Sequence, residues 1–217
     1  MTFNLKKEII IFLAIFFLVS IFIYLLLNGG AYFRILRYDL FLHSPFAEAD
    51  LKNQPILSLK NSFEPQSNQD SKYYLYIPKI DVLTPIVLPK DDSNQNILAS
   101  LEEGTVLYPG SQLPGQAGRS VILGHSSKTA WYRGQYAYVF ALLSKLQSGD
   151  EFYIVFENKK LVYKVFSNDI LTPEQTNKLL SQMPQNESDV ALITCWPIGS
   201  SSMRTLIQAK LDRVEKI

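Results

Sequence analysis

The stretch Asp189-Val-Ala-Leu-Ile-Thr-Cys195 is an apolar run that ends at the only cysteine of this 217-residue chain. Its aliphatic and β-branched residues are typical of a strand, and Trp196-Pro197 follows directly after it. A lone cysteine in such a run is either a small buried side chain or a nucleophile, and a nucleophile must be present as the thiolate. The side chains that accompany Cys195 therefore decide between the two interpretations.

Two further strand-like runs carry side chains that favour a thiolate. One run ends at His125, and another begins at Arg204, nine residues beyond Cys195. Taken singly, such residues are common as a core histidine and a solvated arginine. The chain has only two histidines, however, and the other one, His43, follows the hydrophobic N-terminal segment. The set of cysteine, imidazole and guanidinium predicts acyl transfer through a thioester, with His125 as the partner of Cys195.

The N-terminal segment 9–27 is uncharged and apolar, and at about 1.5 Å per residue it is long enough to cross the roughly 30 Å of a hydrocarbon core. We interpret it as a transmembrane helix. Lys6 and Lys7 precede it, so the positive-inside rule predicts a cytoplasmic N-terminus and an extracellular remainder. The alternative is a cleaved signal peptide, although the apolar run is longer than usual for one.

After the apolar segment the composition changes. Residues 32–42 are typical of an amphipathic helix at the membrane surface, or they extend the anchor helix. Residues 53–72 are rich in Asn, Gln, Ser and Pro and indicate a linker. We therefore expect three parts: 1–28 as cytoplasmic tip and anchor, 29–72 as extracellular juxtamembrane segment and linker, and 73–217 as the catalytic domain.

The remainder of the chain is predicted to be mainly β. Short runs rich in Val, Ile, Tyr and Phe alternate with turn residues, which indicates eight strands, at 74–80, 85–88, 105–108, 120–124, 151–156, 161–166, 190–195 and 204–211. Helices are expected only at 94–101, 138–146 and 173–183, the last capped by Thr172. Many short strands with few helices favour an antiparallel barrel or a sandwich.

Charge and cysteine content narrow the possible partners. The formal net charge is +1, so no polyanion-binding surface is indicated and nucleic acid is not expected as a partner. A single cysteine excludes an intrachain disulfide. The cysteine and histidine lack ligand spacing, so we expect no metal and no cofactor.

From about residue 74 to residue 211 the chain resembles the sortases, cysteine transpeptidases of mainly Gram-positive cell surfaces. The resemblance is carried by Ile77-Pro-Lys-Ile-Asp81, Gly104-Thr-Val-Leu-Tyr-Pro109, Val121-Ile-Leu-Gly-His125 and Leu192-Ile-Thr-Cys195, followed by Arg204. It implies the eight-stranded sortase-type β-barrel, here preceded by one N-terminal transmembrane helix. The chemistry would belong to Cys195, His125 and Arg204.

The resemblance also implies substrates and a location. A membrane-anchored sortase cleaves a C-terminal sorting signal of the LPxTG kind on surface proteins and joins them to an amine of peptidoglycan or of a pilin lysine. Thr194, Trp196 and Ser126 are candidates for oxyanion or substrate contacts. The short step between Cys195 and Arg204 is similar to sortases of classes C, D and E, but the motifs leave the subclass unresolved.

Other classes stay open on the residues alone. A different membrane-tethered cysteine peptidase or hydrolase would share the Cys195 and His125 pair. Papain-like proteases also carry Cys-Trp, but there the cysteine precedes its histidine, which is the reverse of the order here. A non-catalytic β-barrel adaptor with a buried Cys195 is the remaining alternative, and labelling with a thiol-directed reagent separates it from an enzyme.

Overall fold

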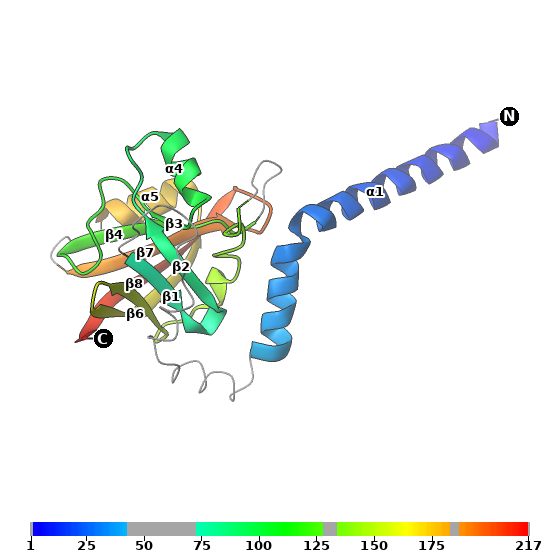
Figure 1. Ribbon diagram of the computed structural model, residues 1–217. Helices are drawn as coiled ribbons and strands as arrows, with labels where there is room; N and C mark the ends of the chain where they lie inside the picture. Colours follow the sequence, from blue (N-terminus) through cyan, green and yellow to red (C-terminus); the bar gives the residue numbers. More distant parts are fainter. Residues whose placement is uncertain (1, 43–72, 128–133, 183–186, 217) are drawn as a thin grey trace.

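The computed structural model describes residues 2–42, 73–127, 134–182 and 187–216. In this part of the chain eight strands close into a barrel in the order β1-β2-β3-β4-β7-β8-β6-β5 (Figure 1). The strands are β1 (Tyr73–Ile77), β2 (Val82–Val87), β3 (Thr105–Leu107), β4 (Gly118–Leu123), β5 (Glu151–Phe156), β6 (Lys159–Leu171), β7 (Ser188–Trp196) and β8 (Met203–Lys216). The predicted eight-stranded barrel is confirmed.

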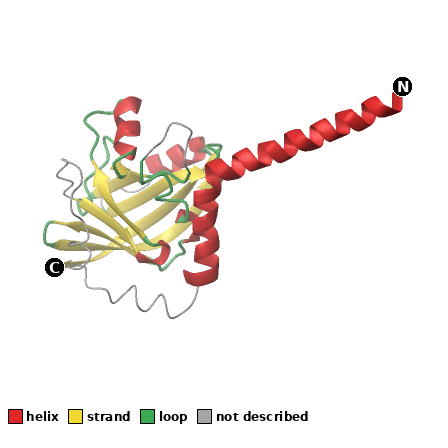
Figure 2. Ribbon diagram, turned by 45° about the vertical axis from the view of Figure 1, so that its right-hand side comes forward, coloured by secondary structure: helices red, strands yellow, loops and turns green. Residues whose placement is uncertain are grey.

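Few helices accompany the barrel (Figure 2). Capping side chains mark the starts of two of them. The helical segments are α1 (Thr2–Arg37), the π-helix η1 (Tyr38–Leu42), the 3₁₀ helices η2 (Pro78–Ile80) and η3 (Leu143–Lys145), α4 (Asn94–Leu101) and α5 (Pro173–Gln182). The Ser93 hydroxyl accepts from the backbone N–H of Asn96 at the start of α4. Thr172 and Gln175 form a reciprocal capping box at α5, with bonds of 2.9 and 3.2 Å.

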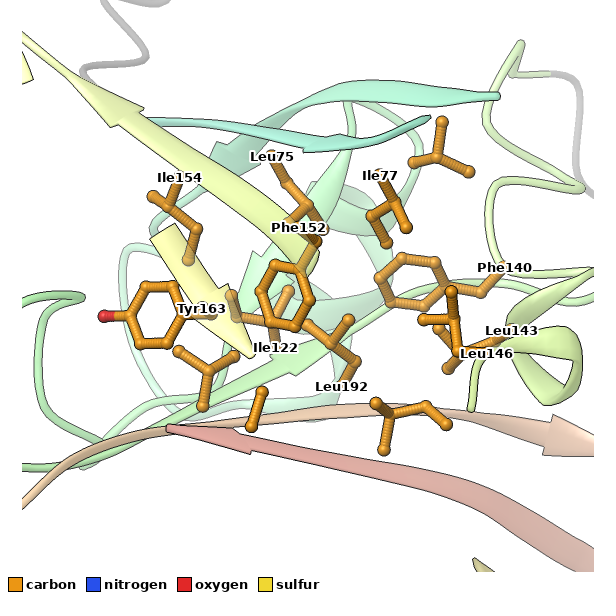
Figure 3. Packing of buried hydrophobic residues seen from close by; sticks show 14 of the residues in the cluster. Leu75, Ile77, Ile122, Phe140, Leu143, Leu146, Phe152, Ile154, Tyr163 and Leu192 are labelled. Carbon is orange, nitrogen blue, oxygen red and sulfur yellow. The ribbon is translucent and has the colours of Figure 1, made fainter. Parts of the chain in front are cut away.

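Alternation along the strands divides apolar side chains between the barrel interior and an outer face. Inward-pointing residues of β7 such as Val190 and Leu192 belong to the main core, together with Phe152 of β5 (Figure 3). The intervening Ala191 and Ile193 belong to a second cluster, outside the barrel, against which Leu179 and Leu180 of α5 pack. Strand β7 is therefore covered on both faces, which explains why its sequence is apolar throughout.

The prediction of a helix at 138–146 is wrong. Only η3 forms in this segment, and the residues before it make tight turns with bonds three residues back, such as Ala141 N–H to the Tyr138 carbonyl at 3.1 Å. The cause is a tertiary hydrogen bond, because Phe140 N–H donates to the His125 carbonyl at 2.8 Å rather than to the carbonyl four residues before it. Phe140 itself is buried and points into the core beside Ile77 and Leu146 (Figure 3).

The N-terminal helix α1 continues beyond the apolar segment. Its stretch Lys7–Leu26 is apolar enough to cross a membrane and none of it is buried. Figures 1 and 2 show that α1 bends, so that a first arm projects away from the barrel and a second arm runs alongside it. The predicted linker 53–72 lies outside the described residues. Residues 32–37 continue α1 and residues 38–42 form η1, so the segment is helical, as both alternatives for it expect.

One glycine fixes how closely the Phe140 segment approaches the end of β4. A Cβ on Gly124 would lie 2.4 Å from Phe140 Cδ2 and 2.8 Å from Cε2. No heavy atom can approach a Cβ so closely without displacement, and Phe140 is enclosed by the core. The absence of a side chain at 124 is therefore a packing requirement.

We predict that Gly124→Ala lowers the free energy of unfolding by about 1 to 3 kcal/mol, the usual cost of overpacking a rigid core. Urea or thermal unfolding of the full chain in detergent measures the change. Gly29→Ala is the matched control, because a Cβ added at Gly29 would have no neighbouring atom within 4 Å. Equal stability of the Gly124 variant and the wild type would show that Phe140 moves aside freely.

Candidate active site

The pairing of three strands brings the three candidate residues to one end of the barrel. Strand β4 runs parallel to β7, with Leu123 opposite Ile193, so both strands end on the same side. Strand β8 runs antiparallel to β7 and pairs Arg204 directly with Cys195. His125 follows Leu123 by two residues, just as Cys195 follows Ile193. The positions of His125, Cys195 and Arg204 are therefore neighbours across adjacent strands.

The parallel ladder continues past the last residue of β4. Gly124 N–H donates to the Ile193 carbonyl at 3.1 Å, and the Thr194 hydroxyl donates to the Gly124 carbonyl at 2.7 Å. Thr194 is buried, and its hydroxyl proton is engaged in this bond. These contacts link the residue before His125 to the residue before Cys195. In this structure the Thr194 hydroxyl serves to hold the two chain segments in register.

Cys195 is a free, partly exposed thiol at the end of β7. Side chains alternate along a strand, so Cys195 points to the same outer face as Ile193, and Arg204 opposite it points to the same face as Leu206. Trp196, the next residue, is partly exposed and lies opposite Met203. The thiol is therefore partly accessible from solvent, and the strand register makes Arg204 its cross-strand neighbour.

The guanidinium of Arg204 is held by the β7–β8 hairpin. Its Nη1 donates to the carbonyls of Ser201 at 2.8 Å and Met203 at 2.9 Å. Within the described residues its Nε and Nη2 donate no hydrogen bond. A planar guanidinium fixed at one nitrogen keeps its other donors available in a set direction. Such a group is suited to bind a carbonyl oxygen or an oxyanion beside Cys195.

His125 is partly buried, and two opposing effects act on its imidazole. Burial lowers the pKa of His125 because it disfavours the charged form, while the Glu102 carboxylate acts in the opposite direction. Glu102 is the C-cap of α4, just before β3, and β3 runs antiparallel to β4 with Val106 opposite Leu123. The turn before β3 therefore lies beside the residues that follow β4. The neutral imidazole favoured at neutral pH is able to accept the thiol proton.

Ser126, predicted as a substrate contact, is buried rather than on an open groove edge. Its Oγ has no hydrogen-bond partner among the described residues. Glu102 was not expected at the site from the sequence, and Phe140 was not expected to contact His125. Both act on His125, Glu102 through charge and Phe140 through its bond to the His125 carbonyl. Only the pairing of β3 with β4 and the tertiary turn reveal these two contacts with His125.

Comparison with known proteins identifies relatives of this barrel. A family model described as "Sortase domain" matches residues 75–212. Among solved structures the chain is similar to sortase A from Corynebacterium diphtheriae, at 31% identity and a TM-score of 0.56, covering 76% of this chain and 72% of that one. Sortase C-3 from Streptococcus pneumoniae matches at 25% identity and a TM-score of 0.56, covering 70% of this chain and 67% of that one. Sortase C-1 from Actinomyces oris matches at 27% identity and a TM-score of 0.55, covering 71% of this chain and 81% of that one. No curated protein sequence matches significantly.

We predict that Glu102→Gln lowers the pKa of His125 below its wild-type value, because burial then acts without the opposing carboxylate. The wild-type pKa is itself expected below the ordinary value of about 6.5. NMR titration of the imidazole resonances measures both, since the chain has only two histidines. Asp92→Asn, an exposed acidic residue before α4, is the control and should leave the pKa unchanged.

The lowered pKa of His125 also determines how the stability of the protein changes with pH. Between the unfolded pKa and the lower folded pKa, the unfolded chain binds more protons at this site than the folded one does. The contribution of His125 to stability is therefore complete above about pH 6.5 and declines as the pH falls through that window. A pKa of His125 that rises in Glu102→Gln would contradict the assignment of Glu102 as its charged neighbour.

Proposed function

The chain belongs to the sortase family of transpeptidases, and we propose that it is a membrane-anchored enzyme whose nucleophile is Cys195. The substrates proposed are surface proteins that carry a C-terminal sorting signal. The acceptor is an amine, of a peptidoglycan precursor or of a pilin lysine. The bond formed is an amide between the two.

The first half-reaction would cleave the sorting signal. The Cys195 sulfur, after giving its proton to His125, attacks the carbonyl carbon of a threonine-glycine-type bond. The oxyanion that forms accepts hydrogen bonds from Arg204. Collapse of the tetrahedral intermediate breaks the carbon–nitrogen bond, and the imidazolium of His125 protonates the departing amine. The amino-terminal part of the substrate remains bound to Cys195 as a thioester.

The second half-reaction would join the substrate to its acceptor. A neutral amine attacks the thioester carbon, His125 takes up its proton, and Cys195 leaves as the thiolate. Proton and bond counts balance without any cofactor. Attack by water instead would give a hydrolase, so the acceptor amine distinguishes a transpeptidase from the peptidase alternative.

The pairing of Arg204 with Cys195 in the β7–β8 ladder is the observation that best supports these roles. The Gly124 bonds to Ile193 and Thr194 add to it, because they hold the His125 segment at the end of β7. Cys195 and Arg204 lie at strand ends, and His125 follows the end of β4 by two residues. Catalytic groups on a rigid scaffold keep the productive geometry with little reorganisation.

We further propose the division of the chain expected from its sequence. Residues 1–28 would form the cytoplasmic tip and the anchor, 29–72 the extracellular juxtamembrane segment and linker, and 73–217 the catalytic domain. The apolar stretch Lys7–Leu26 is compatible with a membrane anchor, and sortases are enzymes of the cell envelope. A cytoplasmic N-terminus follows from the lysines that precede the span.

We predict that Cys195→Ala abolishes the thioester adduct with a sorting-signal peptide while leaving the fold intact. Because Cys195 is the only cysteine, the substitution removes every thiol from the chain. Intact-mass spectrometry of protein mixed with an LPxTG-type peptide detects the adduct, and circular dichroism checks the fold. An adduct on the alanine variant would exclude Cys195 as the nucleophile.

We predict that Arg204→Ala and Arg204→Lys each lower kcat with a fluorogenic sorting peptide by about 10² to 10³, the usual cost of one oxyanion donor. Lysine keeps the charge but loses the planar fork. The change in stability should stay under about 0.5 kcal/mol, as for most surface positions. Arg213→Lys, an exposed arginine on the same strand, is the control and should turn over normally. Normal turnover by Arg204→Lys would leave only a diffuse electrostatic role.

A further inference from the structure

The second arm, which consists of the end of α1 and the π-helix η1, packs one of its faces onto the barrel. Ala31 and Tyr38 are buried, and Ile35 between them packs against the main core cluster. These positions are four and three residues apart, so they share a helix face. A Cβ on Gly30 would lie 2.7 Å from the Tyr138 ring, which shows how closely the helix approaches the barrel.

Polar contacts hold the same arm in place. Arg34 Nη1 donates to the Tyr138 carbonyl at 3.2 Å, and Lys145 Nζ lies 2.8 Å from the Asp39 carboxylate. Lys145 also lies 5.6 Å from the centre of the Tyr38 ring. These contacts tie successive turns of the helix to the barrel, so the arm has one defined position relative to it.

A further contact links the membrane end of α1 to the active-site end of the barrel. The Tyr24 hydroxyl donates to the Ile198 carbonyl at 3.3 Å, and it also lies 2.7 Å from the Tyr32 hydroxyl. Tyr24 belongs to the candidate span Lys7–Leu26, whereas Ile198 lies in the hairpin between β7 and β8. Ile198 is the third residue after Cys195, at most about 11 Å along the chain.

The opposite face of the second arm is apolar and uncovered. Phe33, Leu36 and Leu40 are 66%, 56% and 64% exposed, and their spacing of three and four residues aligns them on one stripe. Arg34 and Arg37 are exposed beside this stripe. The arm therefore has two apolar faces, of which the barrel covers only one. In both views it stands between the barrel and the first arm (Figures 1 and 2).

We propose that this outer stripe of Phe33, Leu36 and Leu40 lies in the interfacial layer of the membrane, so that the barrel rests on the bilayer with its active-site end at the headgroups. The proposal rests on the membrane anchor proposed above. Seven residues of helix, about 10 Å, connect the end of the span at Leu26 to Phe33, so the stripe cannot lie far from the lipid. Arg37, beside the stripe, extends toward lipid phosphates while apolar side chains enter the boundary layer.

The consequence for the enzyme is a defined height of the active site above the membrane. A hairpin that bonds to Tyr24 lies at the level where the anchor leaves the hydrocarbon. A scissile bond next to a membrane-embedded tail would therefore reach Cys195 without leaving the bilayer surface.

Depth-dependent quenching of a fluorescent thiol label tests the proposal. Single cysteines are placed in the full-length Cys195→Ala chain as Leu36→Cys, Ser201→Cys, Phe22→Cys and Asn158→Cys, and each is labelled with bimane. The proteins are reconstituted in vesicles of phosphatidylglycerol and phosphatidylcholine that contain 5-doxyl lipid. Phe22 lies within the span. Asn158 precedes Lys159, which pairs with Lys216 near the C-terminus, on the side of the barrel away from α1 (Figures 1 and 2).

We expect quenching of the labels at 22, 36 and 201 and none at 158. Quenching at 22 without quenching at 36 would overturn the interfacial stripe and leave the anchor standing. Quenching at 22 and 36 but not at 201 would overturn the position of the active site at the headgroups. Absence of quenching at 22 would reject the membrane anchor itself, and the interfacial position of the stripe with it. Equal quenching at 158 would show that the barrel has no preferred orientation.

Discussion

The parallel pairing of β4 with β7 is the constraint on which the site depends. Parallel neighbours end on the same side of a sheet, so the residues that follow both strands must meet there. Antiparallel β8 starts at that same end and adds Arg204 opposite Cys195. Closure of the barrel then fixes these strand ends, because each of the three has a neighbour on both sides. The strand order therefore sets the relative positions of Cys195, Arg204 and the strand end that precedes His125.

Local signals made much of the fold predictable. The eight apolar runs separated by turn residues correspond to the eight strands, and the expected helix at 94–101 begins and ends as predicted. The segment 138–146 failed because its fate depends on a partner far away in sequence, the His125 carbonyl, which withdraws Phe140 N–H from a helical ladder. The hydrophobic periodicity of a segment reports only its local structural preference. It does not indicate a hydrogen bond to a residue far away in the sequence.

Prediction from local sequence had the same limit at the candidate site. Cys195, His125 and Arg204 stood out because each is a polar residue at the edge of an apolar run. Glu102 did not, because an acidic residue at the end of a helix is ordinary on the surface of any protein. Its significance depends on β3 lying against β4, which brings the carboxylate into the field of His125. A residue that acts through a second residue is placed by the strand topology. Composition and motif spacing therefore do not identify it.

Neighbouring strands of the barrel are joined by unequal numbers of residue pairs. Strand β3 joins β2 and β4 through two residue pairs each, supplemented by the Thr105 hydroxyl bonded to the Pro85 carbonyl, whereas β7 and β8 share eight consecutive pairs. Short ladders open locally at a lower free-energy cost than long ones. Local opening of the barrel is therefore expected at β3, next to Glu102 in the preceding turn, rather than at the β7–β8 pairing that contains Cys195. The surroundings of His125 can therefore vary while Cys195 stays in place.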